Sequence, residues 1–155
     1  MKKIDGGVTA AKGFQAAGCA AGIKKEGTMD MPMIFSEVPC HAAGTFTTNV
    51  VKAAPVKWDQ EVVYHQDGAR VVVCNSGIAN ACTGAESMGY CKETAAAASE
   101  MLKVPETAVL VASTGVIGQQ LPTDRIKGGI AKLALMLEDS PEAGAMAARA
   151  IMTTD

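Results

Sequence analysis

The sequence predicts one domain of class α+β over residues 1–155, and three observations lead to this prediction. Residues 6–75 carry short apolar runs broken by Gly, Pro and Asp, which is typical of strands. Residues 85–155 carry apolar residues at helical spacing, with one buried strand between helices. The 155 residues suffice for one proper core, and no repeat, low-complexity tract or linker divides them.

Strands in the first half are predicted at four apolar runs. These are Met33–Phe35, Val50–Val51, Val62–Tyr64 and Arg70–Cys74. Residues 44–49 add a polar and aromatic segment whose Thr residues fit the end of a strand.

The first helix of the second half is predicted to begin near residue 85 and to end before Pro105. One stripe of this helix is expected to face the core. It comprises Met88, Cys91, Ala95, Ala98 and Leu102.

Two further helices are predicted from their starting signals. One follows Pro122, with Thr123 as its N-cap and Asp124 at the positive end of its dipole. Its buried stripe is Ile126, Ile130, Leu133, Ala134 and Leu137. The other begins with Ser140 as N-cap and Pro141 as first helical residue, and runs through Ala150.

Composition limits the classes of function. A net charge of −2 gives no electrostatic case for a nucleic acid or an anionic membrane surface. The two lysines after Met1 precede no apolar stretch, so they do not form a signal peptide, and no apolar run is long enough for a membrane span. We expect a soluble, cytoplasmic protein.

The cysteines and histidines give no sign of a metal or thiol site. The five cysteines are odd in number and form no C-x-x-C pair. Cys40 and His41 are the only Cys/His neighbours, and adjacent residues on a strand point to opposite faces. His41 is expected on a strand and His65 on the surface, neither beside a carboxylate.

The segment Val109–Gly118 carries the main candidate site. Val109–Ala112 has no polar face and predicts a buried strand, and Ser113-Thr114-Gly115 follows where that strand is expected to end. The Thr114 hydroxyl and the Gly115 N–H could point into one small volume and hold an oxyanion. The alternative is a glycine turn that leaves a core strand.

The loop Asn75–Gly84 is the second unusual segment. Eight of its ten residues are Asn, Ser, Thr, Gly or Ala, which suit turns and backbone hydrogen bonds. The asparagines could satisfy their own loop, or the segment could line the site of a polar substrate.

Five motifs in this order resemble the glutamate/ornithine N-acetyltransferase family of arginine biosynthesis. The resemblance covers essentially the whole chain, with Ile78 and Val50 as departures that bear on local substrate contacts only. The motifs are Gly13–Gly18, Thr45–Asn49 with Ala53–Val56, Asn75–Gly84, Ser113–Gly118 and Ala150–Asp155.

The resemblance implies a fold, a mechanism and roles for three residues. The implied fold is an αββα layered sandwich of the self-processing ornithine acetyltransferase/aminopeptidase type. Thr114 and Gly115 match the oxyanion-stabilising pair, and Thr153 matches a substrate-binding threonine. The implied reaction is ping-pong: a threonine takes acetyl from N-acetylornithine and passes it to glutamate. No metal or prosthetic group is implied. Some members also accept acetyl-CoA, and the resemblance does not decide whether this chain does.

The resemblance also implies a partner. Members of the family are made as a precursor that cuts itself before a threonine, and the freed threonine is the nucleophile. The cleavage motif is absent from these 155 residues, so we expect an α-chain part that is inactive without its β chain, in an α2β2 heterotetramer. Thr154 is not the expected nucleophile, because cleavage before it would release only two residues.

Two other functions compete with this one. A self-processing amidohydrolase or aminopeptidase of the same architecture would use the same oxyanion geometry with water as acceptor. A module that binds phosphate at Ser113–Gly118 is disfavoured, because Gln119 and Gln120 stand where a P-loop needs Lys.

Overall fold

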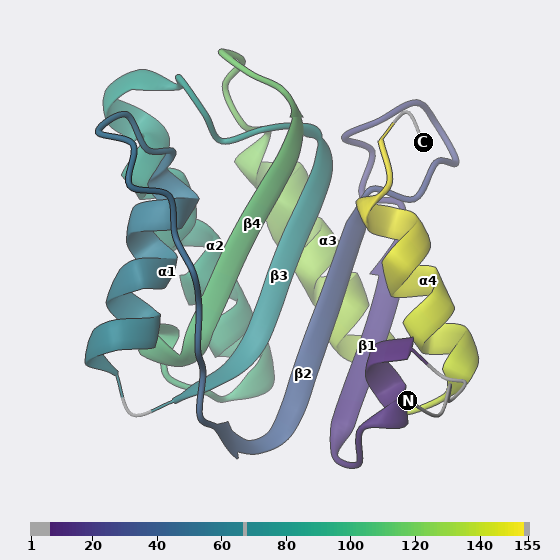
Figure 1. Ribbon diagram of the computed structural model, residues 1–155. Coiled ribbons are helices and arrows are strands. Elements are labelled where there is room, and N and C mark those ends of the chain that lie inside the picture. Colours follow the sequence, from purple (N-terminus) through teal and green to yellow (C-terminus); the bar gives the residue numbers. More distant parts are fainter. Residues whose placement is uncertain (1–6, 67, 154–155) are drawn as a thin grey trace.

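A four-stranded sheet in the order β1-β2-β3-β4 forms the centre of the computed structural model, which describes residues 7–66 and 68–153. The strands β1, β2 and β3 are antiparallel neighbours, whereas β3 and β4 run parallel (Figure 1). Their bounds are β1 Phe14–Cys19, β2 Met31–Cys40, β3 Ala69–Ile78 and β4 Val109–Val116. The predicted α+β class is confirmed.

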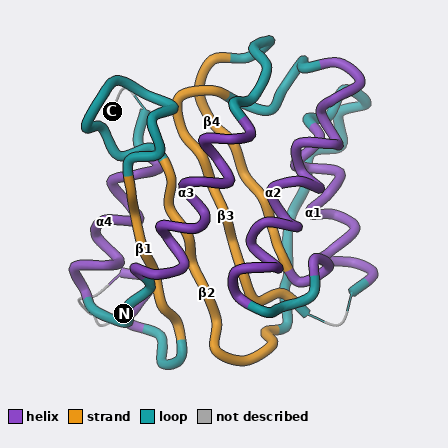
Figure 2. Tube along the Cα trace, turned by 180° about the vertical axis from the view of Figure 1, so that it is seen from behind, coloured by secondary structure: helices purple, strands orange, loops and turns teal. Residues whose placement is uncertain are grey.

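Helices lie on both faces of the sheet. Helix α4 packs on one face against β1 and β2, and Figure 2 shows α2 and α3 across the opposite face. The helices are α1 Ala54–His65, α2 Ser87–Leu102, α3 Thr123–Met136 and α4 Pro141–Ile151, with short 3-10 turns η1 Gly7–Ala10, η2 Gly84–Glu86 and η3 Glu106–Ala108. Of the two facing sheets in an αββα arrangement, the described residues form one.

The core lies between the sheet and helices α2 and α3. Alternate strand residues point into it, as the two-residue period of a strand requires. Methionine and aliphatic side chains fill this layer, since the chain has few aromatic residues. The main members are Met31, Met33, Val71, Val73, Val109, Val111, Cys91, Ala95, Ala98, Ile126, Ile130 and Leu133.

Both edges of the sheet are covered by other parts of the chain. At the β1 edge, Ala16 and Glu138 exchange two backbone hydrogen bonds of 2.9 and 3.1 Å. At the β4 edge, helix α1 uses side chains: Trp58 Nε1 donates to the Val109 carbonyl at 2.8 Å, and Asp59 Oδ1 accepts the Val111 N–H at 2.9 Å. These bonds satisfy backbone groups that an edge strand would otherwise leave unpaired.

Helix predictions in the second half of the chain are confirmed, with two corrections. Ser140 caps α4, since its Oγ accepts the Ala143 N–H at 3.2 Å. Thr123 is not the N-cap of α3: it is the first helical residue after the N-cap Pro122, and no side chain caps this end. On α2, Met88 is 40% exposed because the helix begins at the rim of the core.

Strand predictions in the first half are only partly correct. Met33–Phe35 and Arg70–Cys74 lie in β2 and β3, but Val62–Tyr64 belongs to helix α1. Trp58 and Val62 lie one helical turn apart. This helical spacing determines the structure of the segment, although the run Val62–Tyr64 resembles a strand.

The first-half predictions for residues 44–51 and for His41 are wrong. Val50–Val51 and residues 44–49 form no strand and lie in an exposed connection. His41 follows the end of β2 instead of lying on a strand, because the sheet pairing stops at Cys40. His65 is the last residue of α1 and is exposed, so its predicted place on the surface is confirmed.

The carboxyl group of Asp59 predicts a pH dependence of stability. Burial raises its pKa to about 6, although the hydrogen bond from Val111 lowers it. The unfolded-state pKa of Asp is about 4, so between about pH 4 and pH 6 the folded state binds more protons than the unfolded state. The contribution of Asp59 to the free energy of unfolding is therefore full below about pH 4 and lost above about pH 6.

The variant Asp59→Asn keeps an oxygen acceptor for Val111 and cannot ionise. The free energy of unfolding of the wild type, relative to this variant, should fall by about 1–2 kcal/mol between pH 4 and pH 7.5, a range that allows for solvent screening of a partly exposed group. Urea unfolding of both proteins across this range measures it. Parallel pH profiles would show that Asp59 titrates equally in both states.

Candidate functional site

The two unusual segments of the sequence meet at the carboxyl ends of the parallel strands β3 and β4. The pairing continues to Ile78 opposite Val116, so Ser113-Thr114-Gly115 lies within β4. The sequence had suggested that the strand ends before these residues. The loops beyond the strands stay joined, since the Ala79 N–H donates to the Val116 carbonyl at 2.8 Å. Ligands of α/β sheets commonly bind at such carboxyl ends.

Ser113 and Asn75 tie the two strand ends together inside the protein. The Ser113 hydroxyl donates to Asn75 Oδ1 at 2.7 Å, and Asn75 Nδ2 donates to the Ile78 carbonyl at 2.7 Å. Further along the loop, Asn80 Nδ2 donates to the Ser87 carbonyl at 2.8 Å and Oδ1 accepts the Thr83 hydroxyl at 2.8 Å. The side chains of both asparagines therefore bind within the protein, each to one residue of the loop and one of a neighbouring element.

Gly115 is needed for the close approach of the two strands. Its φ is +129°, and a Cβ there would lie 2.3 Å from the carbonyl carbon and oxygen of Gly77. Gly77 faces Gly115 in the register and has a φ of +108°. No side chain fits between the strands at this level, so Gly115 serves packing whatever its chemical role.

The backbone N–H of Gly115 faces the edge of β4 that does not pair with β3. The peptide groups of Val109 and Val111 point away from β3 toward α1, where Trp58 and Asp59 bind them. The alternation of a strand turns the Gly115 N–H to the same side. This N–H is thus a backbone donor available to a ligand.

Thr114 points to the sheet face that lacks α2 and α3. Alternation places its half-buried side chain on the side of Leu110 and Ala112. Within the part of the chain that the structure describes, its hydroxyl makes no hydrogen bond, so it remains a donor for an incoming group. The assignment of Thr114 and Gly115 as an oxyanion pair stays a prediction.

A surface pocket of about 420 Å³ brings Gly115 and Thr153 together. Its other lining residues are Lys24, Gly77 and Val116, and Thr114 is not among them. Thr153 is exposed just after α4, and Lys24 comes from the connection between β1 and β2. Two of the three predicted site residues therefore share one pocket. Thr154 and Asp155, the end of the fifth motif, lie outside the described residues.

Lys24 is the pocket residue that the sequence reasoning missed. The sequence shows only an adjacent pair of lysines ahead of the first predicted strand, a pattern that usually marks a solvated surface. Its contacts to Met29 and Met152 carbonyls appear only once the chain is folded.

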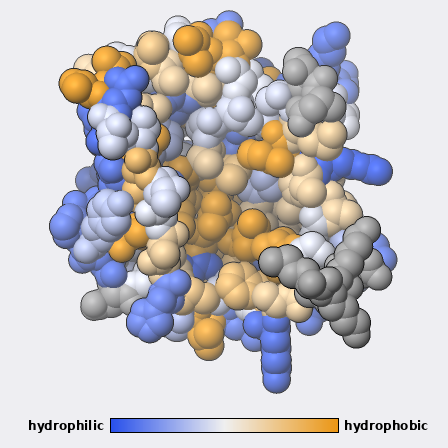
Figure 3. Space-filling model, in the orientation of Figure 1, coloured by the Kyte–Doolittle hydropathy of each residue, from blue (hydrophilic) through white to orange (hydrophobic). Residues whose placement is uncertain are grey.

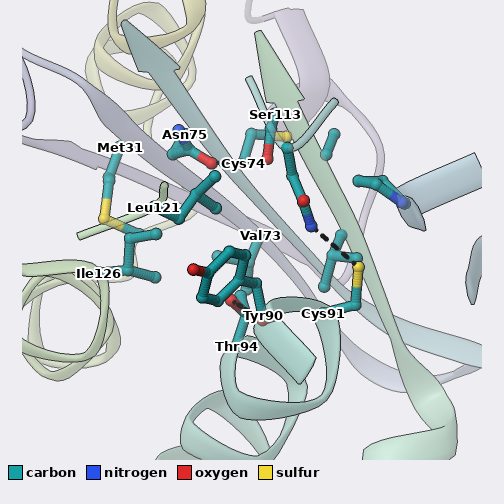
Figure 4. A pocket seen from close by; sticks show the side chains of 14 residues that line it. Met31, Val73, Cys74, Asn75, Tyr90, Cys91, Thr94, Ser113, Leu121 and Ile126 are labelled. Carbon is teal, nitrogen blue, oxygen red and sulfur yellow. Dashed lines mark hydrogen bonds between the residues drawn. The ribbon is translucent and has the colours of Figure 1, made fainter. Parts of the chain in front are cut away.

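A second hollow, beneath the strand ends, is too small for a substrate. Figure 4 shows it among Met31, Tyr90, Cys91 and Ser113, and its volume of about 10 Å³ admits about one water molecule. The 420 Å³ pocket is therefore the better candidate site.

The thiols near the small cavity are not poised for nucleophilic chemistry. Burial, and then the charge of Asp59, raise the pKa of Cys74 to about 11 and that of Cys91 to about 12. Both stay protonated near neutral pH, and a protonated thiol is a poor nucleophile and metal ligand. Among residues 7–66 and 68–153, no three Cys, His, Asp or Glu side chains group as a metal site. The same residues contain no helix with the length and apolarity to cross a membrane.

Comparison with known proteins gives a consistent result. The model of the ArgJ family matches residues 15–155. "Arginine biosynthesis bifunctional protein ArgJ" of Thermotoga neapolitana is 47% identical over 145 residues, which are 93% of this chain and 36% of that protein. The protein of the same name from Symbiobacterium thermophilum is 50% identical over 157 residues, which cover 100% of this chain and 38% of that protein. The chain thus spans less than two-fifths of the length of these curated relatives.

Two solved structures share the fold. The ArgJ structure of Bacillus halodurans has a TM-score of 0.91 and 41% identity, covering 97% of this chain and 77% of that chain. The ornithine acetyltransferase of Mycobacterium tuberculosis, solved as a complex with ornithine, has a TM-score of 0.91 and 45% identity, covering 96% and 80%.

The variants Gly115→Ala and Gly118→Ala separate close packing from backbone conformation. Both glycines have positive φ, which costs a side chain about 1–2 kcal/mol, but a Cβ on Gly118 meets nothing within 4 Å. A Cβ on Gly115 overlaps the Gly77 backbone, so Gly115→Ala should cost more than about 4 kcal/mol of unfolding free energy. Denaturant unfolding measures both, and equal losses would refute the role of Gly115 in strand contact.

Proposed function

The chain belongs to the ArgJ family, and from this premise we propose that it supplies the oxyanion and substrate-binding side of a glutamate/ornithine N-acetyltransferase in arginine biosynthesis. The observation that supports this proposal is the pocket that Gly115 and Thr153 share, although 38 residues separate them in sequence. The solved relative bound to ornithine is consistent with a small amino acid as ligand.

The reaction runs in two acyl-transfer steps. The hydroxyl oxygen of a threonine on the β chain attacks the acetyl carbonyl of N-acetylornithine, and the C–N bond breaks as the ornithine amine takes up a proton. The amine of glutamate then attacks the resulting acetyl ester and regenerates the threonine. The α-amino group of that threonine acts as base, because its pKa of about 8 suits proton transfer near neutrality.

Thr114 and Gly115 act on the charge that forms between these states. Attack on the carbonyl puts negative charge on its oxygen, and the Thr114 hydroxyl and the Gly115 N–H donate to it. Such donors accelerate the reaction because the charge is larger in the transition state than in the substrate. The proposed reaction uses no metal or prosthetic group and needs no acetyl-CoA, which some members of the family also accept.

The partner is the later part of a longer precursor, arranged as an α2β2 heterotetramer. This chain covers 77–80% of the solved chains but 36–38% of the curated proteins, so the solved chains are about half as long as those proteins. That ratio supports two chains from one precursor. Figure 3 shows a hollow on the sheet face beside α4 with apolar residues at its floor, and Ile34, Val72 and Leu110 are half-buried there. A β chain would cover such a surface.

The rival hydrolase would pass the acyl group to water. Its products are free acetate and an amine, whereas the transferase yields N-acetylglutamate. A single assay with N-acetylornithine and glutamate, in which acetate and N-acetylglutamate are both quantified, separates the two reactions. The name of the solved relative from Mycobacterium tuberculosis, ornithine acetyltransferase, favours the transferase.

The variant Thr114→Ala in the full-length enzyme tests the oxyanion role. Removing one donor to a charge of the transition state should lower kcat by about 10²–10³ with little change in KM. Thr114→Ser keeps the hydroxyl and is the matched control. If Thr114 only supports the strand end, the Ala variant will keep its kcat and lose about 1 kcal/mol of stability in a thermal melt.

The variant Thr153→Ala tests the substrate contact. Loss of one neutral hydrogen bond is worth about 0.5–1.5 kcal/mol, so KM for N-acetylornithine should rise about tenfold or less. The melting temperature should change little, because Thr153 is exposed after the end of α4. An unchanged KM would remove Thr153 from the binding site.

A further inference from the structure

Lys24 joins two segments that are far apart in the sequence. Its ammonium donates to the Met29 carbonyl at 3.4 Å and to the Met152 carbonyl, which lies 128 residues away. Figure 1 shows the end of α4 against the connection between β1 and β2, where Lys24 lies. Met152 directly precedes Thr153, so this bond fixes the backbone beside a predicted substrate contact.

The backbone of Lys24 is itself held by a buried carboxylate. Asp30 is fully buried, and its two oxygens accept the N–H groups of Ala21 at 2.7 Å, Ile23 at 2.6 Å and Lys24 at 3.0 Å. Hydrogen bonds to an ionised acceptor are stronger than neutral ones. The start of the Lys24 side chain is therefore fixed, which reduces the entropy lost when its ammonium binds Met152.

The aliphatic stem of Lys24 crosses the end of β3 at Gly77, which has no side chain. A Cβ on Gly77 would lie 2.9 Å from Lys24 Cγ. Gly77 pairs with Gly115, so the lysine stem passes next to the two glycines that close the strand ends. This route brings the ammonium to the 420 Å³ pocket that Lys24 lines together with Thr153.

We infer that Lys24 is a positioning residue that holds Thr153 in the acyl-transfer site, a role that rests on the proposed function. The Met152 carbonyl follows the last turn of α4, where helical dipoles leave partial negative charge, and a cation is a favourable partner there. Lys24 thus caps α4 from a different part of the chain.

A second contact confines the effect of Lys24 to the last residues of the described chain. Ser76 Oγ donates to the Ala150 carbonyl at 2.5 Å and seats the end of α4 on β3 without Lys24. Loss of the ammonium should therefore loosen the backbone between Met152 and Thr153 while α4 stays in place.

The test uses Lys24→Met in the full-length enzyme, because Met keeps an apolar stem and removes the charge. Lys25→Met is the matched control, since Lys25 is the exposed neighbour in the same loop. KM for N-acetylornithine should rise up to about tenfold in Lys24→Met with kcat nearly unchanged, and Lys24→Arg should restore part of the loss. In a protein that already carries Thr153→Ala, Lys24→Met should change KM little further, because both variants remove the same contact between Thr153 and the substrate.

Backbone hydrogen exchange of residues 151–153 provides a readout independent of activity. Exchange should be faster in Lys24→Met than in Lys25→Met, while the β4 amides stay protected in both. Equal exchange in the two variants, or additive effects of Lys24→Met and Thr153→Ala on KM, would overturn the inference. A wild-type enzyme without acetyl transfer would refute the proposed function, whereas the exchange comparison would still decide whether Lys24 holds this segment.

Discussion

The buried carboxylate of Asp30 organises the end of the sheet on which the candidate site depends. Burying a charge is costly unless hydrogen bonds replace its water, and three backbone N–H groups of residues 21–24 do so here. The carbonyl of Asp30 also accepts the Ser76 N–H at 2.8 Å, which joins the loop to β3. Ser76 in turn binds Ala150 at the end of α4. One residue thus connects β1, β2, β3 and the last helix.

In the proposed function, the site assembled there supplies stabilising and binding groups, and the nucleophile comes from the β chain. Two glycines bring the parallel strands into contact and turn a free N–H of Gly115 toward the strand edge. The buried thiols Cys74 and Cys91 remain protonated, because burial raises their pKa values. This division agrees with a protein whose nucleophile comes from another segment, as the proposed precursor requires.

Local signals predicted the helices of the second half, whereas long-range contacts determined what the sequence analysis missed. Ser140 and Pro141 mark the start of α4 within a few residues, so this helix was predictable. Ser113-Thr114-Gly115 looks locally like a turn, but pairing with β3 extends the strand through it. Helix α1 was missed because the apolar run Val62–Tyr64 resembles a strand, although Trp58 and Val62 lie one helical turn apart. The residues themselves indicated Thr114 and Gly115, whereas Thr153 came from the family resemblance and Lys24 depends on a contact that only the folded chain shows.

The most direct test of this account is backbone hydrogen exchange in Asp30→Asn, compared with Glu26→Gln, an exposed acid of the same loop. Asparagine keeps one carbonyl oxygen and directs an amide group at N–H donors, so it cannot satisfy all three. If Asp30 organises the site, Asp30→Asn should show faster exchange at residues 21–24 and 151–153 and weaker acetyl transfer by the full-length enzyme. Protection and activity equal to those of Glu26→Gln would contradict the claim that Asp30 organises the site.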